Sequence, residues 1–272
     1  MNTSTAMAMS SRLEARRVSL GYEGEPVVDG LDLAIPDGEF TAIIGPNACG
    51  KSTVLKGLAR LLAPSVGEVL LDGRAIAQQS TADVARRLGL LPQGGSVPDG
   101  IRVVDLVARG RFAHQRFLRR WSEADASAVD RAMADARVAG LADRVVDELS
   151  GGQRQRVWLA LVLAQQTPLL LLDEPTTYLD VNHQLEVLDL CARLRREGRT
   201  VVAVLHDLNQ AIRYATHLVA MRDGRIVMAG SPEEVVTAEL LREVFRIEAL
   251  VLDDPTSGGP LVVPVRPLSG EA

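Results

Sequence analysis

The sequence predicts an α/β fold organised around a phosphate-binding loop and a mainly parallel sheet. Residues 45–53 match the pattern G-x-x-x-x-G-K-[ST], which cradles phosphate groups. An apolar run, residues 40–44, precedes this loop, and apolar residues at helical spacing follow it. A second apolar run, residues 169–172, ends in two acidic residues, as buried parallel strands do when functional groups lie at their carboxyl ends.

Each residue of the phosphate loop is a candidate contact for the phosphates of a nucleotide. Its glycines let backbone N–H groups turn toward anionic oxygens, and the following helix adds the positive end of its dipole. Lys51 brings a cation to the β- and γ-phosphates, the Ser52 hydroxyl can ligate Mg²⁺, and the Thr53 hydroxyl can contact phosphate. The alternative, a glycine-rich turn before an ordinary helix, fits the flanking pattern less well. The full set is Gly45, Pro46, Asn47, Ala48, Cys49, Gly50, Lys51, Ser52 and Thr53.

Composition narrows the function classes. The chain has 272 residues and a net charge of −5, which does not indicate a nucleic-acid partner. Its two cysteines, Cys49 and Cys191, form neither a metal-binding spacing nor a disulfide framework, which fits a reducing compartment. No apolar run reaches membrane-spanning length, so we expect any link to a membrane to come through another protein.

The N-terminal part predicts a tail followed by strands. We expect residues 1–12 to form a disordered tail and residues 13–44 to form short strands. Asp37-Gly38 and Asp72-Gly73 are hairpin signals. Tyr22, after the first strand, could stack on adenine or be an ordinary half-buried tyrosine, and its position alone favours neither.

The middle of the chain combines a polar strand end with a helical region. Residues 88–92 predict a strand, and Gln93 after it could reach a metal-bound water. Residues 103–146 are mostly helical in pattern, with a helix start at Ser122. The basic and aromatic segment 111–121 could dock a partner, although a solvated helix end is the more common meaning of such a charge run.

A second helix start is also suited to anions. Ser150, Gly151 and Gly152 lead into a predicted helix from Gln153 to Ala164, whose first N–H groups are free. Two phosphate-binding helix starts in one chain make sense if the second serves a nucleotide held by another copy.

Three residues at strand ends are candidates for metal binding and hydrolysis. Asp173 and Glu174 are successive residues of a strand, so their side chains point to opposite faces and should have different roles. Asp173 suits Mg²⁺ binding through water, and Glu174 suits polarising the attacking water. His206 ends the strand 201–205 and could reach the γ-phosphate. We expect the other three histidines to be structural: His114, His183 and His217.

The C-terminal part of the sequence predicts further helices and strands. Asp180 predicts a helix cap, residues 217–228 a hairpin, and Ser231 another helix start. After Glu248 the chain becomes strand-like, and we expect residues 265–272 to be a loose tail.

Taken together, these motifs resemble the ATPase subunit of ATP-binding cassette (ABC) transporters, from about Leu13 to Pro264. The resemblance implies a single domain over residues 13–264, with a P-loop NTPase (RecA-like) core. It also implies an N-terminal antiparallel β subdomain and a helical subdomain at about residues 95–160. In this family Tyr22 corresponds to the adenine-stacking aromatic, Gln93 to the metal- and partner-sensing glutamine, and residues 149–153 to the signature. Asp173 and Glu174 correspond to the Mg²⁺ aspartate and the catalytic glutamate, with His206 as the switch histidine.

The resemblance also implies partners. We expect a head-to-tail homodimer with two ATP molecules, at the cytoplasmic face of the membrane as a peripheral subunit. Integral permease subunits, and through them a substrate-binding protein, complete the expected assembly, which excludes nucleic acid. Ala48-Cys49 replaces the Gly-Ser often seen in this loop, where only backbone N–H groups are needed. The implied contacts to the partner's ATP are Ser150, Gly151, Gly152, Gln153 and Asp180, and the implied Mg²⁺ ligands are Ser52, Gln93 and Asp173.

A finer resemblance concerns cargo. Residues 175–184, 205–210 and 110–114 resemble subunits that drive uptake of ferric siderophores, with haem and cobalamin importers close by. The same motor could serve another cargo. A soluble cassette ATPase acting on DNA or the ribosome is the third possibility, but such proteins usually carry paired cassettes or long coiled coils, and neither is visible in this sequence.

Overall fold

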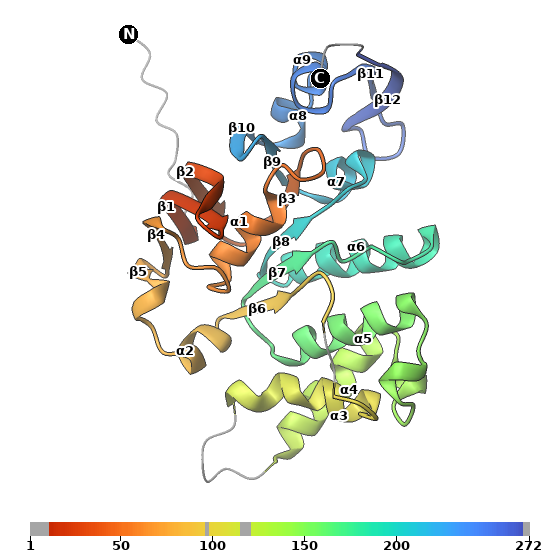
Figure 1. The fold of residues 1–272 in the computed structure, drawn as a ribbon. Helices are drawn as coiled ribbons and strands as arrows, with labels where there is room; N and C mark the ends of the chain where they lie inside the picture. Colours follow the sequence, from red (N-terminus) through yellow and green to blue (C-terminus); the bar gives the residue numbers. More distant parts are fainter. Residues whose placement is uncertain (1–10, 96–97, 115–120, 269–272) are drawn as a thin grey trace.

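A computed structural model describes residues 11–95, 98–114 and 121–268 (Figure 1). The strands are β1 (Ser11–Tyr22), β2 (Glu25–Pro36), β3 (Phe40–Ile44), β4 (Val66–Leu71), β5 (Arg74–Ala75), β6 (Leu88–Leu91), β7 (Leu169–Asp173), β8 (Thr200–Val204), β9 (His217–Arg222), β10 (Arg225–Gly230), β11 (Ile247–Asp253) and β12 (Pro260–Pro267). The α-helices are α1 (Lys51–Leu58), α2 (Thr81–Ala85), α3 (Val103–Ala108), α4 (Glu123–Asp135), α5 (Gly151–Ala164), α6 (Val181–Arg196), α7 (Leu208–Tyr214), α8 (Pro232–Val235) and α9 (Ala238–Phe245). Short 3₁₀ helices are η1 (Ile76–Gln78), η2 (Arg109–His114), η3 (Ala139–Leu141) and η4 (Val146–Glu148).

A six-stranded sheet in the order β10-β9-β3-β8-β7-β6 forms the centre of the molecule. Every neighbouring pair in it is parallel except β9 with β10. Strands β3, β7 and β8 are buried along their whole length, because helices and the second sheet cover both faces. Parallel pairing brings the carboxyl ends of these three strands to one edge of the sheet. The predicted mainly parallel α/β core is confirmed.

Two hydrophobic clusters lie on opposite faces of this sheet. Alternate residues of β3 belong to different clusters: Ala42 and Ile44 face the larger one, and Ile43 faces the other. The larger cluster also contains Leu106 from α3 and Val129 from α4. Cys191 is buried within it on α6, as expected of a small core residue.

The second sheet, β2-β1-β4-β5, is antiparallel, as predicted for the N-terminal region. Its first two strands are longer than the expected short strands, since β1 and β2 pair from Ser11↔Pro36 to Tyr22↔Glu25. Ser11 and Arg12 are therefore strand residues, which corrects the expected tail, whereas residues 1–10 of that tail lie outside the described part.

The two predicted hairpin turns in this region have different outcomes. Asp72-Gly73 joins the antiparallel pair β4 and β5, which confirms that hairpin. Asp37-Gly38 makes a turn between β2 and β3, but these strands do not pair, so the hairpin prediction was wrong. The physical reason is that the wholly apolar β3 is buried on both faces when it pairs with β8 and β9.

Helices α3, α4 and α5 pack together at one end of the molecule, beyond β6 (Figure 1). Helix α4 begins after Ser122, which forms a capping box with Asp125, as the helix start predicted. Within segment 111–121, Arg111 is buried and its Nε donates to Asp125 Oδ1 at 3.0 Å. The prediction that this segment is a solvated helix end is therefore wrong for Arg111. Phe112 and Trp121 are exposed, and residues 115–120 lie outside the described part.

The C-terminal region forms two hairpins. The pair β9 and β10, joined at Asp223-Gly224, confirms the hairpin predicted over residues 217–228. Strand β12 pairs with β11 as far as Ile247↔Pro267, so the expected loose tail is wrong for residues 265–267, and residues 269–272 lie outside the described part. None of the helices in the described ranges is long and apolar enough to cross a membrane.

Candidate active site

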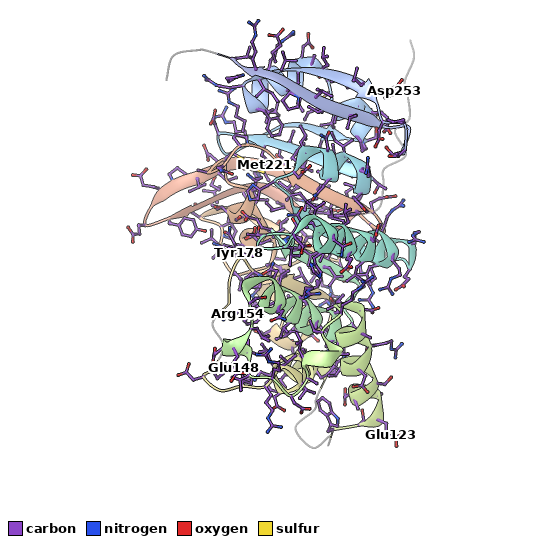
Figure 2. All side chains as sticks on the ribbon, turned by 90° about the vertical axis from the view of Figure 1, so that its right-hand side faces the viewer. Glu123, Glu148, Arg154, Tyr178, Met221 and Asp253 are labelled. Carbon is purple, nitrogen blue, oxygen red and sulfur yellow. The ribbon has the colours of Figure 1, made fainter. Side chains whose placement is uncertain are left out.

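The phosphate loop curls at two glycines. Gly45 has φ 150° and Gly50 has φ 99°, and Gly50 is the N-cap of α1. A Cβ on Gly45 would lie 2.2 Å from the carbonyl oxygen of Met221 on β9, so any other residue would clash with backbone. Met221, labelled in Figure 2, lies on β9 of the central sheet.

Lys51 holds the loop in this shape. Its buried ammonium donates to the carbonyl oxygens of Gly45 at 2.9 Å and Pro46 at 2.7 Å. Burial raises the pKa of the neighbouring Cys49 thiol, so this side chain stays neutral. The Cys49 carbonyl accepts a hydrogen bond from Gly224 N at 3.1 Å, which ties the loop to the β9–β10 turn.

Asp173 and Ser52 meet at the start of α1. Ser52 Oγ donates to Asp173 Oδ1 at 2.8 Å, and burial raises the pKa of the Asp173 carboxyl. A hydroxyl and a carboxylate are both hard oxygen ligands of the kind that Mg²⁺ prefers. The two residues present therefore fit a magnesium ion at this position.

Glu174 points the other way and meets His206. His206 Nε2 lies 2.6 Å from Glu174 Oε1, and Thr177 Oγ1 donates to Glu174 Oε2 at 3.1 Å. Gln155 Nε2 on α5 donates to the Glu174 backbone carbonyl at 3.3 Å. Glu174 also has φ 51°, a conformation uncommon for a non-glycine residue and often found at functional sites. Strand β7 ends at Asp173, so Glu174 is not the strand residue that the sequence predicted, although the two carboxylates do contact different groups, Ser52 for Asp173 and His206 for Glu174.

Part of the phosphate loop lines one cavity of about 580 Å³ together with Glu174 and His206. The predicted site residues Gly45, Pro46, Cys49 and Asp173 are not among the residues that line it. The residues that face the cavity come from distant parts of the chain: the phosphate loop, Gln93 after β6, Glu174 and His206. Its lining is Val27, Asn47, Ala48, Gly50, Lys51, Ser52, Thr53, Gln93, Glu174 and His206. The arrangement can surround a chain of phosphates with backbone N–H groups and a cation, and it presents a carboxylate beside them.

Tyr22 is not part of this lining. Its side chain is 46% exposed, and Lys56 Nζ lies 5.8 Å from its ring centroid. Val27, which the sequence reasoning missed, faces the cavity instead. No local pattern marks Val27, because this β2 residue approaches the loop only through tertiary packing: a Cβ on Gly50 would lie 3.5 Å from Val27 Cγ1.

The helix start that the sequence predicts as a second anion site does not face this cavity. Ser150 and Gln153 make a capping box at the start of α5, with Gln153 N donating to Ser150 Oγ at 3.3 Å. Within the described residues, neither the turn 150–153 nor Asp180 lines the cavity. A Cβ on Gly152 would lie 3.1 Å from the Tyr178 carbonyl oxygen, so this glycine permits close packing of the two loops.

Tyr178 and Asp180 lie on the loop that follows β7. Tyr178 is 81% exposed, and in Figure 2 it lies between the level of Met221 and the helical end marked by Arg154. Asp180 is the N-cap of α6 and accepts from His183 N at 3.0 Å.

Two further contacts were missed by sequence reasoning. Thr177 and Gln155 hold Glu174, and a threonine three residues after the catalytic candidate was the available signal for the first. Nothing in the sequence around Gln155 predicts its contact with Glu174, because that contact forms only when α5 packs against the end of β7. Of the histidines expected to be structural, His114 Nε2 bonds the Gln165 carbonyl at 2.7 Å, and His217 lies on β9, where burial lowers its pKa.

Comparison with known protein families and relatives identifies the chain. Residues 28–177 match the family described as ABC transporter. The ferric enterobactin transport ATP-binding protein FepC of Escherichia coli is 53% identical, with 94% of each chain covered. The Bacillus subtilis protein named "Probable siderophore transport system ATP-binding protein YusV" is 52% identical, over 95% of this chain and 94% of that one. A cobalamin import ATP-binding protein of Halobacterium salinarum is 41% identical, over 93% of this chain and 63% of that one.

Solved structures agree. An inward-facing metal-chelate type ABC transporter, described as putative, superposes with a TM-score of 0.78 at 28% identity, over 94% of this chain and 98% of that one. A bacterial ABC transporter cassette solved as a dimer superposes with a TM-score of 0.74 at 27% identity, over 81% of this chain and 98% of that one. The chain therefore belongs to the ABC transporter family, as an ATP-binding subunit that hydrolyses ATP to drive transport.

Proposed function

We propose that this chain is the ATP-hydrolysing subunit of an importer of ferric siderophores, working through separate membrane subunits. The observation that supports this cargo is sequence identity above 50%, over nearly the whole chain, to siderophore transport ATP-binding proteins. The cavity of the preceding section supports the motor function, because it unites a phosphate loop with a carboxylate and a histidine.

Nucleotide binding rests on the phosphate loop. Backbone N–H groups of residues 45–53 and the start of α1 receive the phosphates, with Lys51 supplying the balancing cation. Ser52 and Asp173, with Gln93 at the cavity wall, would hold Mg²⁺, which supplies positive charge against the β- and γ-phosphates. Tyr22, which is exposed, remains the proposed adenine contact.

Hydrolysis rests on Glu174 and His206. Glu174 accepts a proton from, and orients, the attacking water, while Thr177 and His206 fix the two oxygens of its carboxylate. His206, which lines the same cavity, would also contact the γ-phosphate. The contribution of these groups is positioning and electrostatic stabilisation of charge in the transition state.

The site is completed by a second copy. The Ser150–Gln153 turn offers backbone N–H donors at a helix start but does not reach the cavity of its own chain. Tyr178 and Val181, beside Asp180, are 81% and 68% exposed, an apolar surface next to the same turn. A head-to-tail dimer would bring this surface and the turn 150–153 over the partner's ATP, an arrangement supported by the similarity to a cassette solved as a dimer.

Motion follows from ATP binding and hydrolysis. ATP closes the dimer, and charge repulsion between the products reopens it. Gln93 and the helical end of the molecule would pass this motion to permease subunits at the cytoplasmic face of the membrane. We also infer that residues 13–264 act as a single domain with a helical subdomain near 95–160, because one hydrophobic cluster joins Leu106 and Val129 to the sheet.

The cargo is tested by reconstitution with the membrane partner. The complex is purified, placed in lipid vesicles with its substrate-binding protein, and its ATPase rate is measured with a ferric catecholate siderophore, with haem and with cobalamin. We expect the ferric siderophore alone to stimulate hydrolysis. Stimulation by cobalamin alone would favour the activity named for the halobacterial relative and would contradict the proposed cargo.

A further inference from the structure

His206 is not held in place by burial. It lies after β8 and before α7, and its side chain is 46% exposed. Helix α7 has only seven residues, and a helix this short is not stable without tertiary contacts. The position of His206 therefore depends on what fixes α7.

Asn209, in the first turn of α7, binds the backbone of β12 at both ends of its amide. Its Nδ2 donates to the Val262 carbonyl at 3.0 Å, and Val262 N donates to its Oδ1 at 2.9 Å. Val262 is itself buried, so this pair of hydrogen bonds is anchored in the core. Such a two-way contact specifies both the identity of the side chain and its orientation.

Arg213, near the end of α7, binds the same hairpin at its turn. Its Nη2 and Nε lie 2.7 and 3.2 Å from Asp254 Oδ2. Hydrogen bonds from Thr256 and Ser257 also reach this carboxylate, and together these contacts hold the pKa of Asp254 well below its usual value. Helix α7 is thus tied to the β11–β12 hairpin at both of its ends.

We propose that Asn209 is a positioning residue for ATP hydrolysis, and that the β11–β12 hairpin is a brace that keeps His206 facing Glu174. The proposal rests on the role given above to His206. Asp207 links the two features, because it follows His206 and caps α7 by accepting from Gln210 N at 2.8 Å. A displacement of the first turn of α7 would move the His206 backbone with it.

The first experiment compares Asn209→Ala with the parent chain in the assembled transporter, or in the purified subunit where it hydrolyses ATP alone. We expect kcat to fall about tenfold or more, since small misplacements of catalytic groups are costly, while KM for ATP and the melting temperature change little. Asn209→Asp places a carboxylate oxygen against the Val262 carbonyl where the parent has a donor, so its kcat should fall at least as far as that of Asn209→Ala. Glu248→Ala, which removes an exposed ion pair with Arg266 on the same hairpin, is the control and should leave kcat unchanged.

The second experiment asks whether Asn209 acts through His206. Single-turnover hydrolysis is measured for Asn209→Ala, His206→Ala and the double variant. The brace predicts that Asn209→Ala has no further effect once His206 is removed. An equal fold-loss in both backgrounds, or an unchanged rate for Asn209→Ala alone, would overturn it.

Two outcomes separate the brace from the proposed function. A normal rate for His206→Ala alone would contradict the role of His206 and the brace with it. Slow hydrolysis by the His206→Ala variant, together with a normal rate for the Asn209→Ala variant, would contradict the brace but not the proposed role of His206. If Asn209→Ala does not fold, Arg213→Lys provides the same test at the other end of α7, with a smaller expected loss of kcat and the same dependence on His206.

Discussion

His206 Nε2 lies 2.6 Å from Glu174 Oε1, and this contact joins the residues that follow two neighbouring parallel strands. It forms because β7 and β8 are parallel and pair in register from Leu169↔Thr200 to Asp173↔Val204. Both strands therefore end at the same edge of the sheet. The carboxylate and the imidazole then share the cavity that contains the phosphate loop.

Replacing Glu174 by glutamine should separate binding from hydrolysis. The amide keeps the shape of the side chain but cannot accept a proton, so we expect turnover to fall on the order of a hundredfold or more. Affinity for ATP should be retained, as measured by equilibrium binding of a fluorescent ATP analogue. Glu148→Gln, at an exposed position of the helical end (Figure 2), is the matched control, and near-normal turnover in Glu174→Gln would remove Glu174 from its role.

Alanine at Gly45 should disrupt the phosphate loop. A Cβ there would lie 2.2 Å from the Met221 carbonyl oxygen, and φ 150° is strained for an alanine. We expect nucleotide binding to be lost and the melting temperature to fall. Gly140→Ala adds the same methyl group where nothing lies within 4 Å, and it should change neither quantity. Normal nucleotide binding by Gly45→Ala would show that the loop does not need this conformation.

Arginine at Ser150 should stop hydrolysis without affecting the chain's own nucleotide binding. The turn 150–153 does not line the cavity of its own chain, so the monomer should bind ATP as before. A bulky cation in this turn would block its approach to a partner's phosphates. Ser231→Arg breaks the equivalent capping box of α8 and controls for loss of a helix cap. Loss of ATP binding in the isolated Ser150→Arg monomer would argue against a site shared between copies.

The sequence predicted those parts of the site that depend on local motifs and on parallel strands. The phosphate loop is recognisable because a few residues in fixed order determine its shape. Glu174 and His206 could be assigned to one site in advance because the carboxyl ends of parallel strands meet at one edge, although their direct contact was not predicted.

Other features could not be predicted, because they depend on contacts between distant segments. Val27 lies on β2 and lines the cavity only when β2 packs against the phosphate loop, and Asn209 contacts Val262 only once the C-terminal hairpin has formed. Arg111 was misread for the same reason, since its basic neighbours suggested a solvated surface. Its partner Asp125 lies on the next helix, and the two bury each other's charge.

The buried pair of Arg111 and Asp125 should make stability depend on pH. Hydrogen bonds from Ser122, together with the Arg111 guanidinium, lower the pKa of Asp125 to about 2. Because this pKa is lower in the folded chain than in the unfolded chain, the carboxylate adds stability that is fully present above about pH 4 and is lost as the pH falls toward 2.

Asp125→Asn should therefore cost about 3 kcal/mol at pH 7, since it leaves the Arg111 guanidinium buried and uncompensated. Denaturant unfolding of both chains between pH 7 and pH 2 measures the difference, which should shrink below pH 4. Asp130→Asn, at an exposed position of the same helix, should have little effect at any pH. A difference that does not change with pH would contradict the assigned role of the Asp125 carboxylate.

The molar mass of Glu174→Gln in the presence of ATP and Mg²⁺ tests the shared site most directly. Light scattering after size-exclusion chromatography should give the mass of two chains with ATP and of one chain without it. Adding Ser150→Arg to the same chain should return the ATP-bound form to one chain. An ATP-bound Glu174→Gln that elutes as a single chain, in a protein whose parent hydrolyses ATP at a rate proportional to its concentration down to high dilution, would contradict the account.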